Sequence, residues 1–333
     1  MPKRSYFGLS VPVLVGIIVI ILALLVISLL TGAVGQSLFA KYGVDISLPG
    51  WLSVPQPHPE LPAEEVIHFF HIDFLGSFGS VGITNTIIST WLSIIVLVGI
   101  SYAVTRRLKL IPNRLQSILE AALGWLLNFC QEVAGEKNGR RFFPIVATIF
   151  LFVITNAWLS LLPGFGSITF TNTEGEVIHL LRGANTDINI PLALALISFI
   201  CVEYWGISSL GGLRYLQKFV NVGQFFRGLG QVMRGKLKAG LVGMFNGAID
   251  IFVGVLETLS EFIRIVSFTF RLFGNMTAGE ILLLIVAFLI PWVASVLFYG
   301  FELFVGVVQA LIFGGLTLIF ATIAVTHHEP EKA

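Results

Sequence analysis

Residues 267–280, SFTFRLFGNMTAGE, place an arginine, an asparagine and a glutamate inside one of the most hydrophobic regions of the chain: Arg271, Asn275 and Glu280. An arginine at the centre of a membrane helix costs about 2.5–3.5 kcal/mol on insertion scales, and it keeps its charge there. Arg271 therefore needs either a partner or a function.

The composition identifies the class of protein. Of 333 residues, 56% are hydrophobic and only 12% are charged, about half the charge of a typical soluble protein. We expect an all-α polytopic membrane protein with about six membrane helices. The net charge of +1 gives no reason to expect nucleic acid as a partner, and the sequence shows no phosphate-binding glycine loop and no motif for a cofactor. Cys130 and Cys201 lie in apolar segments without a metal-binding spacing, so they are interpreted as core residues.

The first 35 residues are predicted to be a membrane anchor. Lys3 and Arg4 precede an apolar run of 21 residues, 11–31, which matches the ~20 residues needed to cross a bilayer with the N-terminus in the cytoplasm. A cleaved signal peptide is the alternative, with Ala33 and Gly35 near the cleavage site, although its apolar core is longer than the usual ~7–15 residues.

Residues 36–85 form a polar, proline-containing and acidic segment that is predicted to be external. Within it, His68 and His71 would share one face of a helix. A metal site needs more ligands than this stretch offers, so an interfacial helix is the favoured interpretation.

Residues 86–333 are predicted to form the main membrane domain. The apolar run 86–104 ends in basic residues that mark a cytoplasmic end, and residues 116–133 are expected to form a helix along that interface. Residues 142–162, with Asn156, then cross outward, and residues 190–210 return after an external loop that contains Asp187 and Asn189. The basic stretch that follows, 214–238, is explained better by topology and contact with lipid phosphates than by nucleic acid.

Residues 240–290 are compatible with helix over about 75 Å, whereas the hydrocarbon core is ~30 Å thick. This segment either breaks or runs strongly tilted. Pro291 and Trp292 are the predicted external turn before a second long helix, 293–325, so the two form a hairpin over about 240–325. The C-terminus is predicted to be cytoplasmic.

Phasing at 100° per residue places six polar side chains on one stripe of the first helix of this hairpin. They are Glu257, Ser260, Arg264, Ser267, Arg271 and Asn275. Glu280 points about 180° away from Arg271, so an ion pair within the helix is excluded. Helix-packing hydrogen bonds would explain Ser260, Ser267 and Asn275 equally well, and snorkelling at the interface would explain Arg264 and Glu257.

Residues equally distant from Pro291 lie at similar depth in the two antiparallel helices. Glu280 and Glu302 are each 11 positions away, and Arg271 and Gln309 are 20 and 18 positions away. A tilt of roughly 60° would bring Arg271 to the middle of the bilayer. Buried charges at matched depths favour a function over a structural role for Arg271, Glu280 and Glu302.

The segment FRLFGNMTAGE, followed by VQALIF around Gln309, resembles subunit a of the F-type ATP synthase, and the likeness covers about residues 66–325. Asn156 and the triplet Asp187-Ile188-Asn189 support it more weakly. The resemblance implies that Arg271 is the essential stator arginine and Gln309 its neighbour. It also implies that Glu280 belongs to the outer half-channel, and Glu257 and Ser260 to the cytoplasmic one.

The sequence departs from the family pattern at Glu302, where some relatives carry histidine. The outer path would then contain a glutamate pair, and two carboxyl groups can share a proton.

The resemblance implies a non-catalytic, multi-pass subunit of the F0 sector in a bacterial inner membrane. Its expected partners are a ring of c subunits facing Arg271, peripheral-stalk b subunits and membrane lipid, with no nucleotide site in this chain. A sodium-coupled version of the same subunit stays open, because the ion-binding carboxylate belongs to the ring. A self-contained secondary transporter usually shows inverted repeats, which the sequence lacks, and an unpaired buried arginine argues against a purely structural scaffold.

Overall fold

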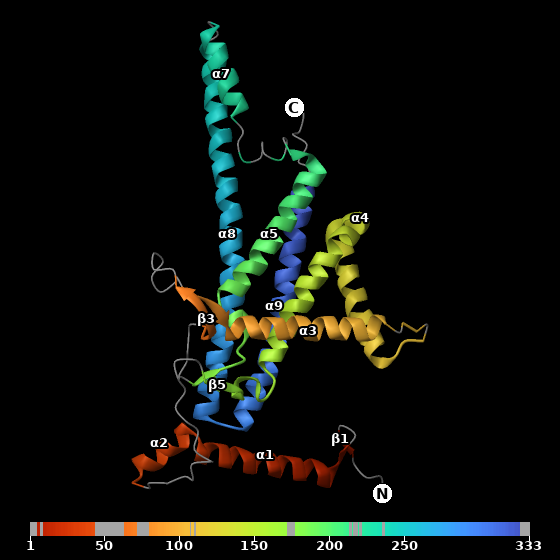
Figure 1. The fold of residues 1–333 in the computed structure, drawn as a ribbon, viewed down its shortest axis with the longest axis vertical. Coiled ribbons are helices and arrows are strands. Elements are labelled where there is room, and N and C mark those ends of the chain that lie inside the picture. Colours follow the sequence, from red (N-terminus) through yellow and green to blue (C-terminus); the bar gives the residue numbers. More distant parts are fainter. Residues whose placement is uncertain are drawn as a thin grey trace. The chain divides into compact units, whose positions relative to one another are not determined.

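In the residues that it describes, the computed structural model contains mainly helices, most of them long, together with three short antiparallel strand pairs (Figure 1). The structure describes residues 5–6, 9–43, 63–71, 80–106, 108–109, 111–171, 177–212, 215, 219, 222–234 and 237–326. Six helices in this part of the chain are long and apolar enough to cross a membrane. The prediction of an all-α polytopic membrane protein with about six spans is confirmed.

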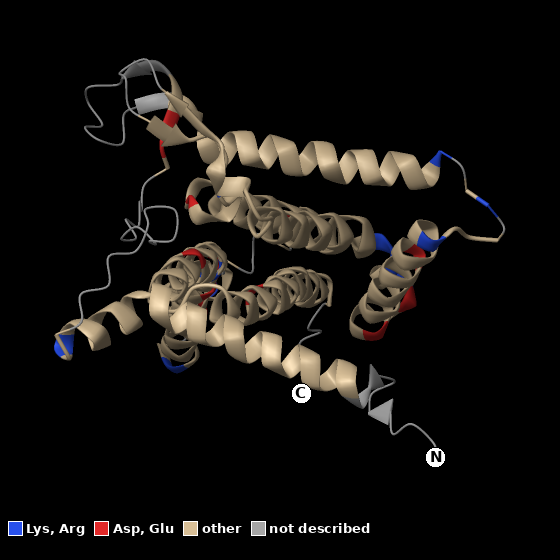
Figure 2. Ribbon diagram, turned by 90° about the horizontal axis from the view of Figure 1, so that it is seen from below, with Lys and Arg blue, Asp and Glu red and all other residues tan. Residues whose placement is uncertain are grey.

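The helices follow the order expected from the apolar runs. Their bounds are α1 Val11–Thr31, α2 Ala33–Lys41, α3 Asn85–Thr105, α4 Arg114–Ser160, α5 Asn189–Leu210, α7 Gly223–Met233, α8 Leu237–Leu289 and α9 Val293–Val325. The paired strands are β1 Ser5–Tyr6 with β2 Leu9–Ser10, β3 Glu65–His71 with β4 Ser80–Thr84, and β5 Thr169–Thr171 with β6 Val177–His179. Figure 2 shows the charged residues mainly at helix ends and in loops, which leaves long stretches of α1 and α3 uncharged.

The chain forms two compact units that interleave along the sequence. Unit 1 contains Met1–Ile88, Ala157–Thr186 and Gly274–Val307, and unit 2 contains Ser89–Asn156, Asp187–Phe273 and Val308–Ala333. Unit 1 thus collects the polar N-terminal segment, the loop between α4 and α5, and the turn of the C-terminal hairpin. Apart from the first span, these are mainly the segments that the sequence predicts to be external.

Residues 65–71 form a strand, so the helix expected around His68 and His71 is wrong. This strand, β3, pairs with β4 through an antiparallel ladder that has irregularities. Valine, isoleucine and phenylalanine favour strands, and Val66 is buried whereas its neighbour Ile67 is exposed, as the two-residue period of a strand requires. The division of the chain into an anchor, an external segment and a membrane domain stays a prediction.

Helix α4 consists of two arms that fold back on each other. Gly135 has φ 78° and ψ 162°, outside the helical region, and glycine adopts positive φ without steric cost. Gly139 lies so close to the backbone of Cys130 and Gln131 that a side-chain carbon would collide with it. The two helices predicted at 116–133 and 142–162 are therefore confirmed, with the bend between them at Gly135.

The core of unit 2 lies where the second arm of α4 packs against α5 and α9. Phe142 and Trp205 have ring centroids 4.5 Å apart, and Val146, Val202 and Leu318 are buried beside them. Between α5 and α9, the hydroxyls of Ser198 and Thr317 share a hydrogen bond of 2.8 Å.

The predicted C-terminal hairpin is confirmed. Helices α8 and α9 flank Pro291 and Trp292, whose φ of 70° lies in the left-handed region. Its register also agrees with equal distances from Pro291. In unit 2, Phe268 and Phe313 have ring centroids 4.8 Å apart, and in unit 1, Gly279 lies against the carboxylate of Glu302. By this register, Arg271 is level with Gln309 and Ala310.

Helix α8 has 53 residues and is thus about 80 Å long, far more than the thickness of a bilayer. Within unit 2, α3 runs crosswise to α8 (Figure 1). The 21 residues of α3 are about 31 Å long and would fit an upright span. An upright α3 would place α8 at a large tilt, as its length requires.

The C-terminal end of α1 contacts the hairpin turn within unit 1. The Ser28 hydroxyl donates a hydrogen bond to the Pro291 carbonyl, and Gly32 packs against the backbone of Leu289. Most other side chains of α1 are apolar and exposed, as expected for a helix that faces lipid.

Candidate functional site: charged residues of the helical hairpin

Arg271 is a partly buried cation on α8 whose guanidinium makes few polar contacts. Its Nη2 donates a long hydrogen bond of 3.4 Å to the Ser267 hydroxyl, and its Cζ lies 5.8 Å from the centre of the Phe268 ring. Nη1 is buried and has no hydrogen-bond partner. Among the residues that the structure describes, no carboxylate is within ion-pair distance of this guanidinium.

Arg264, two turns earlier on α8, has a carboxylate partner, although its buried Nε has no hydrogen-bond partner among the described residues. Its Nη1 lies 2.6 Å from Oε2 of Glu261 and its Nη2 donates to Oε1 at 3.0 Å. The exposed fractions of the Arg264 and Glu261 side chains are 13% and 7%. The guanidinium also lies 3.8 Å from the centre of the Phe320 ring on α9. The interpretation of Arg264 as a snorkelling residue is therefore wrong, because its charge is turned inward and neutralised.

The other members of the predicted stripe are less constrained. Ser260 is exposed, and Glu257 and Ser267 are partly buried. One turn beyond Arg271, the buried Nδ2 of Asn275 has no hydrogen-bond partner. The Arg264 guanidinium lies over Phe320 on α9 and is paired with Glu261, whereas Arg271 has no carboxylate partner among the described residues.

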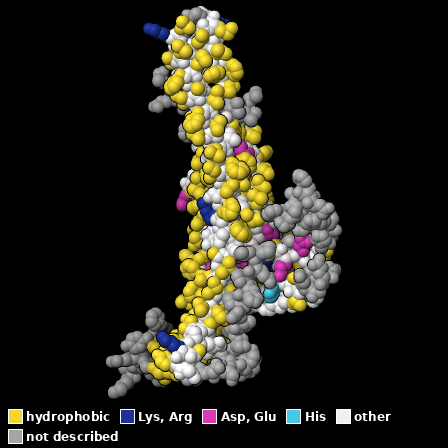
Figure 3. All heavy atoms as spheres, turned by 90° about the vertical axis from the view of Figure 1, so that its left-hand side faces the viewer, with side chains coloured by type: hydrophobic (Ala, Val, Ile, Leu, Met, Phe, Trp, Pro, Cys, Tyr) yellow, Lys and Arg dark blue, Asp and Glu magenta, His cyan; other side chains and the backbone are white. Residues whose placement is uncertain are grey.

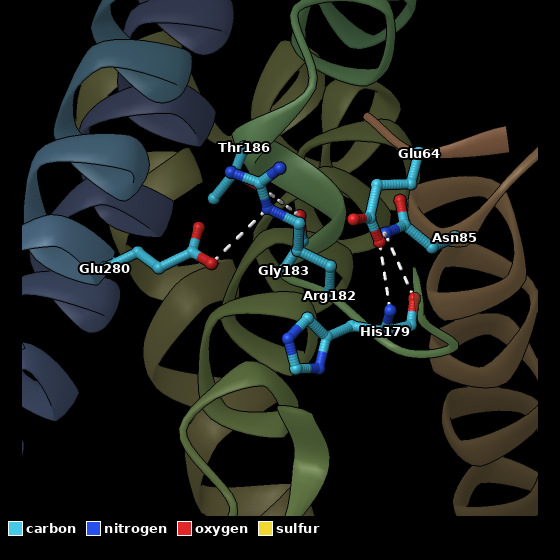
Figure 4. A network of polar contacts seen from close by, with 7 residues as sticks. All are labelled: Glu64, Asn85, His179, Arg182, Gly183, Thr186 and Glu280. Atoms are coloured by element: carbon cyan, nitrogen blue, oxygen red, sulfur yellow. Dashed lines mark hydrogen bonds and ion pairs between the residues drawn. The ribbon is translucent and has the colours of Figure 1, made fainter. Parts of the chain in front are cut away.

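Glu280 has a cationic partner from the loop between α4 and α5. Nε of Arg182 lies 3.3 Å from Oε1 of Glu280, with side chains that are 10% and 36% exposed (Figure 4). The sequence analysis missed Arg182, because nothing local in the sequence links it to a glutamate 98 positions later. An arginine in a loop predicted to be external, where acidic residues dominate, was the available signal.

A hydrogen-bonded clasp holds the loop that carries Arg182. Oε2 of Glu64 accepts hydrogen bonds from Nδ2 of Asn85 at 3.3 Å and from the backbone N–H of His179 at 3.0 Å. Nδ2 of Asn85 also donates to the His179 carbonyl at 3.2 Å. The clasp joins the segment before β3, the start of α3 and the end of β6, three residues before Arg182 (Figure 4).

Glu302 is buried near the turn of the hairpin, at about the level of Glu280. A side-chain carbon at Gly279 would collide with its carboxylate, so glycine creates the space for this acid. The indole N–H of Trp158 donates to the carbonyl of the next residue, Leu303, at 3.2 Å. Gly306 packs against Ala157, which brings the end of α4 against this part of α9.

The remaining predicted site residues lie mainly in unit 2. Both polar atoms of the Asn156 side chain are buried without a hydrogen-bond partner. Asp187 is buried, and its Oδ1 accepts the backbone N–H of Asn189 at 3.0 Å at the start of α5. Gln309 is partly buried, at the level of Arg271. In unit 1, Asn185 resembles Asn156 in having a buried amide without partners, and the sequence analysis did not single it out.

Comparison with known proteins identifies the family of this chain. The family model described as ATP synthase A chain matches residues 87–322. The chain belongs to this family. The match covers the whole of α8 and most of α9. It therefore includes Arg271, Glu280, Glu302 and Gln309.

Curated relatives agree with this assignment. The chain is 29% identical over 259 residues to ATP synthase subunit a of Aliarcobacter butzleri, covering 77% of this chain and 96% of the relative. It is 32% identical over 245 residues to that of Gloeobacter violaceus, covering 74% and 85%. The corresponding protein of Helicobacter pylori is 29% identical over 230 residues, covering 69% and 84%. The resemblance inferred from FRLFGNMTAGE is confirmed.

A second polar cluster of this family member involves Tyr215 and Glu203 in unit 2. The Tyr215 ring is buried against Gly206 on α5. Burial raises the pKa of the Tyr215 phenol, and the Glu203 and Glu261 carboxylates raise it further while Arg264 lowers it. The phenol therefore stays neutral at physiological pH, and it lies within electrostatic reach of the Glu261–Arg264 pair.

The described part of the chain contains no group of three or more histidine, cysteine, aspartate or glutamate side chains that could hold a metal ion. His68 and His71 take part in β3 through their backbones.

Proposed function

We propose that this chain is the stator subunit of the F0 sector of an ATP synthase, and that it forms two proton half-channels against a ring of c subunits. Membership of the ATP synthase A chain family supports the general role. The chain would supply no catalytic group for ATP chemistry, which would take place elsewhere in the complex.

The observation that carries this proposal is the partly buried guanidinium of Arg271, which has no carboxylate partner among the described residues and whose buried Nη1 has no hydrogen-bond partner there. A charge removed from water without a counter-charge is costly, so a protein that retains one usually uses it. A carboxylate of a ring subunit would complete the site. At 4 Å and an effective dielectric of 20, such a pair is worth about 4 kcal/mol, enough to keep the passing carboxylate ionised. Because a guanidinium stays charged, it would also block a direct proton leak between the two paths.

The outer half-channel would lead from Asp187 and Asn189 to Glu280 and Glu302. The buried amide of Asn156 lacks partners, and buried polar groups of this kind are commonly satisfied by ordered water. Glu280 and Glu302 lie at one level of the hairpin and are the candidates for delivering the proton to the ring. Arg182 would hold Glu280 in place.

The cytoplasmic half-channel would pass Glu257 and Ser260, which are on α8 on the other side of Arg271 from Glu280. Ser267, Asn275 and Gln309 would surround the arginine and orient it. Each proton that crosses gains about 2.3 kcal/mol per 100 mV, which rotation of the ring can transmit to ATP synthesis.

The proposal includes the setting of the protein. The chain would lie in a bacterial inner membrane with both termini in the cytoplasm, if the N-terminal anchor is retained. Peripheral-stalk b subunits would hold it against the torque of the ring. The lengths of its apolar helices and the basic residues between α5 and α8 support this topology.

The test is Arg271→Ala, assayed as ATP-driven proton pumping in vesicles that contain the assembled complex. We expect pumping to fall on the order of a hundredfold or more, because the electrostatic term near 4 kcal/mol is lost. Arg140→Ala is the matched control, since Arg140 is exposed and pairs with Glu136 on its own helix at 3.1 Å. Near-normal coupled pumping by the Arg271 variant would refute the proposal.

A further inference from the structure

Helix α7 packs closely on the first turns of α8. Gly228 lies against the backbone of Gly243 and Met244, Gly247 against Phe225, and Gly240 against Val232. The position numbers in each pair add up to nearly the same value, so the two helices are antiparallel. A side-chain carbon at any of these glycines would collide with the opposite helix, so α7 is held at a fixed rotation about its own axis.

This fixed rotation gives the exposed surface of α7 two distinct stripes. Taking Phe226 as zero and 100° per residue, Met233 and Leu229 fall near −20° and −60°. These three apolar side chains are exposed, Phe226 at 64% and Met233 at 83%. Arg234 and Arg227, also exposed, fall near 80° and 100°. An apolar stripe thus lies directly beside a basic one.

The apolar surface continues onto the start of α8. Leu241, Val242 and Phe245 are exposed there, and Figure 3 shows the α7–α8 end of the molecule covered with hydrophobic side chains and with basic side chains near its tip. From residue 204 to residue 249 the sequence contains no aspartate or glutamate. Lys238 adds a further exposed positive charge at the start of α8.

We propose that the hairpin of α7 and the first turns of α8 is a docking surface for anionic lipid. The stripe of Phe226, Leu229 and Met233 would enter the acyl boundary, while Arg227 and Arg234 would reach the phosphate level. An amphipathic helix in a membrane interface needs this arrangement, with apolar and basic side chains on adjacent faces. Acidic headgroups also match a surface that has three basic side chains and no acidic one.

Anionic lipid explains both stripes together. A purely apolar partner would leave the arginines unmatched, and a soluble acidic partner would leave Phe226 and Met233 in water. The inference does not depend on proton transport, because it uses neither Arg271 nor the two glutamates.

The test places a spin label at Met233→Cys or at Gln231→Cys, in a full-length chain with Cys130→Ala and Cys201→Ala. Gln231 falls near 140°, on the polar side of α7. In vesicles of phosphatidylglycerol and phosphatidylcholine, we expect the label at 233 to be accessible to oxygen and protected from a water-soluble nickel reagent. The label at 231 should show the opposite pattern. Equal exposure of both labels to the nickel reagent would overturn the proposal.

Charge dependence is tested by Arg227→Gln/Arg234→Gln in the chain labelled at 233. Each arginine near an anionic surface contributes about fivefold to attachment, so the ratio of attached to released label should fall about 25-fold. It should fall similarly for the unchanged chain in pure phosphatidylcholine. The control Lys137→Gln/Arg140→Gln, at the exposed bend of α4, should leave the ratio unchanged.

Two further outcomes would contradict the proposal. The label at 233 could be equally attached in charged and uncharged vesicles, which would show that the arginines do not select the lipid. Alternatively, it could be water-exposed in vesicles of the chain alone and shielded from both reagents in the complete complex. That result would assign the surface to a protein partner instead.

Discussion

Arg264 and Arg271 are seven residues apart on α8, yet they are in opposite electrostatic situations. Arg264 pairs through two nitrogens with Glu261 and stacks on Phe320, whereas Arg271 has one long hydrogen bond and a buried Nη1 without a partner. Both are arginines in the same apolar helix. Burial therefore does not separate the two arginines, and neither does an unused donor, since the buried Nε of Arg264 also has no hydrogen-bond partner among the described residues. What separates them is that Arg264 has a carboxylate partner.

The cause of the difference is local. Glu261 is three positions before Arg264, a spacing that brings two side chains together on a helix. The corresponding neighbours of Arg271, three and four positions away, are Ser267, Phe268, Gly274 and Asn275, and none of them is acidic. The helix thus neutralises one arginine and gives the other no acidic neighbour at helical spacing.

The largest difference between Arg264 and Arg271 is expected when each arginine is replaced by lysine. Arg271→Lys should lower ATP-driven proton pumping on the order of a hundredfold, because an ammonium can lose its proton when buried and lacks the planar donor fork. Arg264→Lys should lower it less than about threefold, since a lysine can still pair with Glu261. Similar losses in both variants would show that the two charges do the same work.

Stability should show the reverse order. Glu261→Gln leaves Arg264 buried without a counter-charge and should cost about 3–5 kcal/mol, measured as thermal unfolding in detergent. The double variant Glu261→Leu/Arg264→Leu should recover most of that loss, because no unpaired charge remains. Arg271→Leu should not destabilise the chain. If Glu261→Gln has the same unfolding temperature as the unchanged protein, the Glu261–Arg264 pair does not stabilise the packing of α8 against α9.

The Arg182–Glu280 pair extends the comparison to unit 1, with a smaller expected effect. Glu280 is about one-third exposed, so solvent screens the pair and its coupling should be about 1 kcal/mol, or about fivefold in pumping rate. Arg182→Gln should slow pumping by that factor, Arg182→Lys should restore part of it, and Arg182→Gln should add nothing in a Glu280→Gln background. If the losses of Arg182→Gln and Glu280→Gln add up in the double variant, Arg182 does not act through Glu280.

The smallest effect is expected at Ser267. Its hydroxyl is 3.4 Å from Arg271, at the limit for a hydrogen bond. Ser267→Ala should therefore change pumping by less than about twofold, on the order of 0.5 kcal/mol or less. A loss as large as that of Arg271→Lys would show that the helix itself anchors the arginine.

The sequence was sufficient where the determining contacts are local or periodic. The apolar period and Pro291 predicted the hairpin, its register and the two helices that form the arms of α4, because each depends on nearby residues. Arg271 stood out for the same reason, as a charge inside an apolar run.

Contacts between distant residues account for what was missed. Arg182 meets Glu280 across 98 positions, and the Glu64 clasp joins segments 21 and 115 positions away, which no spacing rule captures. Strand β3 was predicted as a helix because it has too few apolar residues to distinguish the 3.6-residue period of a helix from the two-residue period of a strand. The pairing with β4 is what decides between them. The packing of α7 depends on glycines at which α8 approaches closely, and this requirement cannot be recognised from the sequence of α7 alone.

The contact between Ser28 and Pro291 has a consequence for biosynthesis. The two residues are 263 positions apart, so at about 5–20 residues per second the ribosome needs roughly 13–50 s to deliver Pro291 after Ser28. During that time α1 has no hairpin turn to contact and is surrounded by lipid or by the insertion machinery. The uncharged surface of α1 is compatible with lipid during this time. Formation of the Ser28–Pro291 contact would be among the last steps in the maturation of a newly made chain.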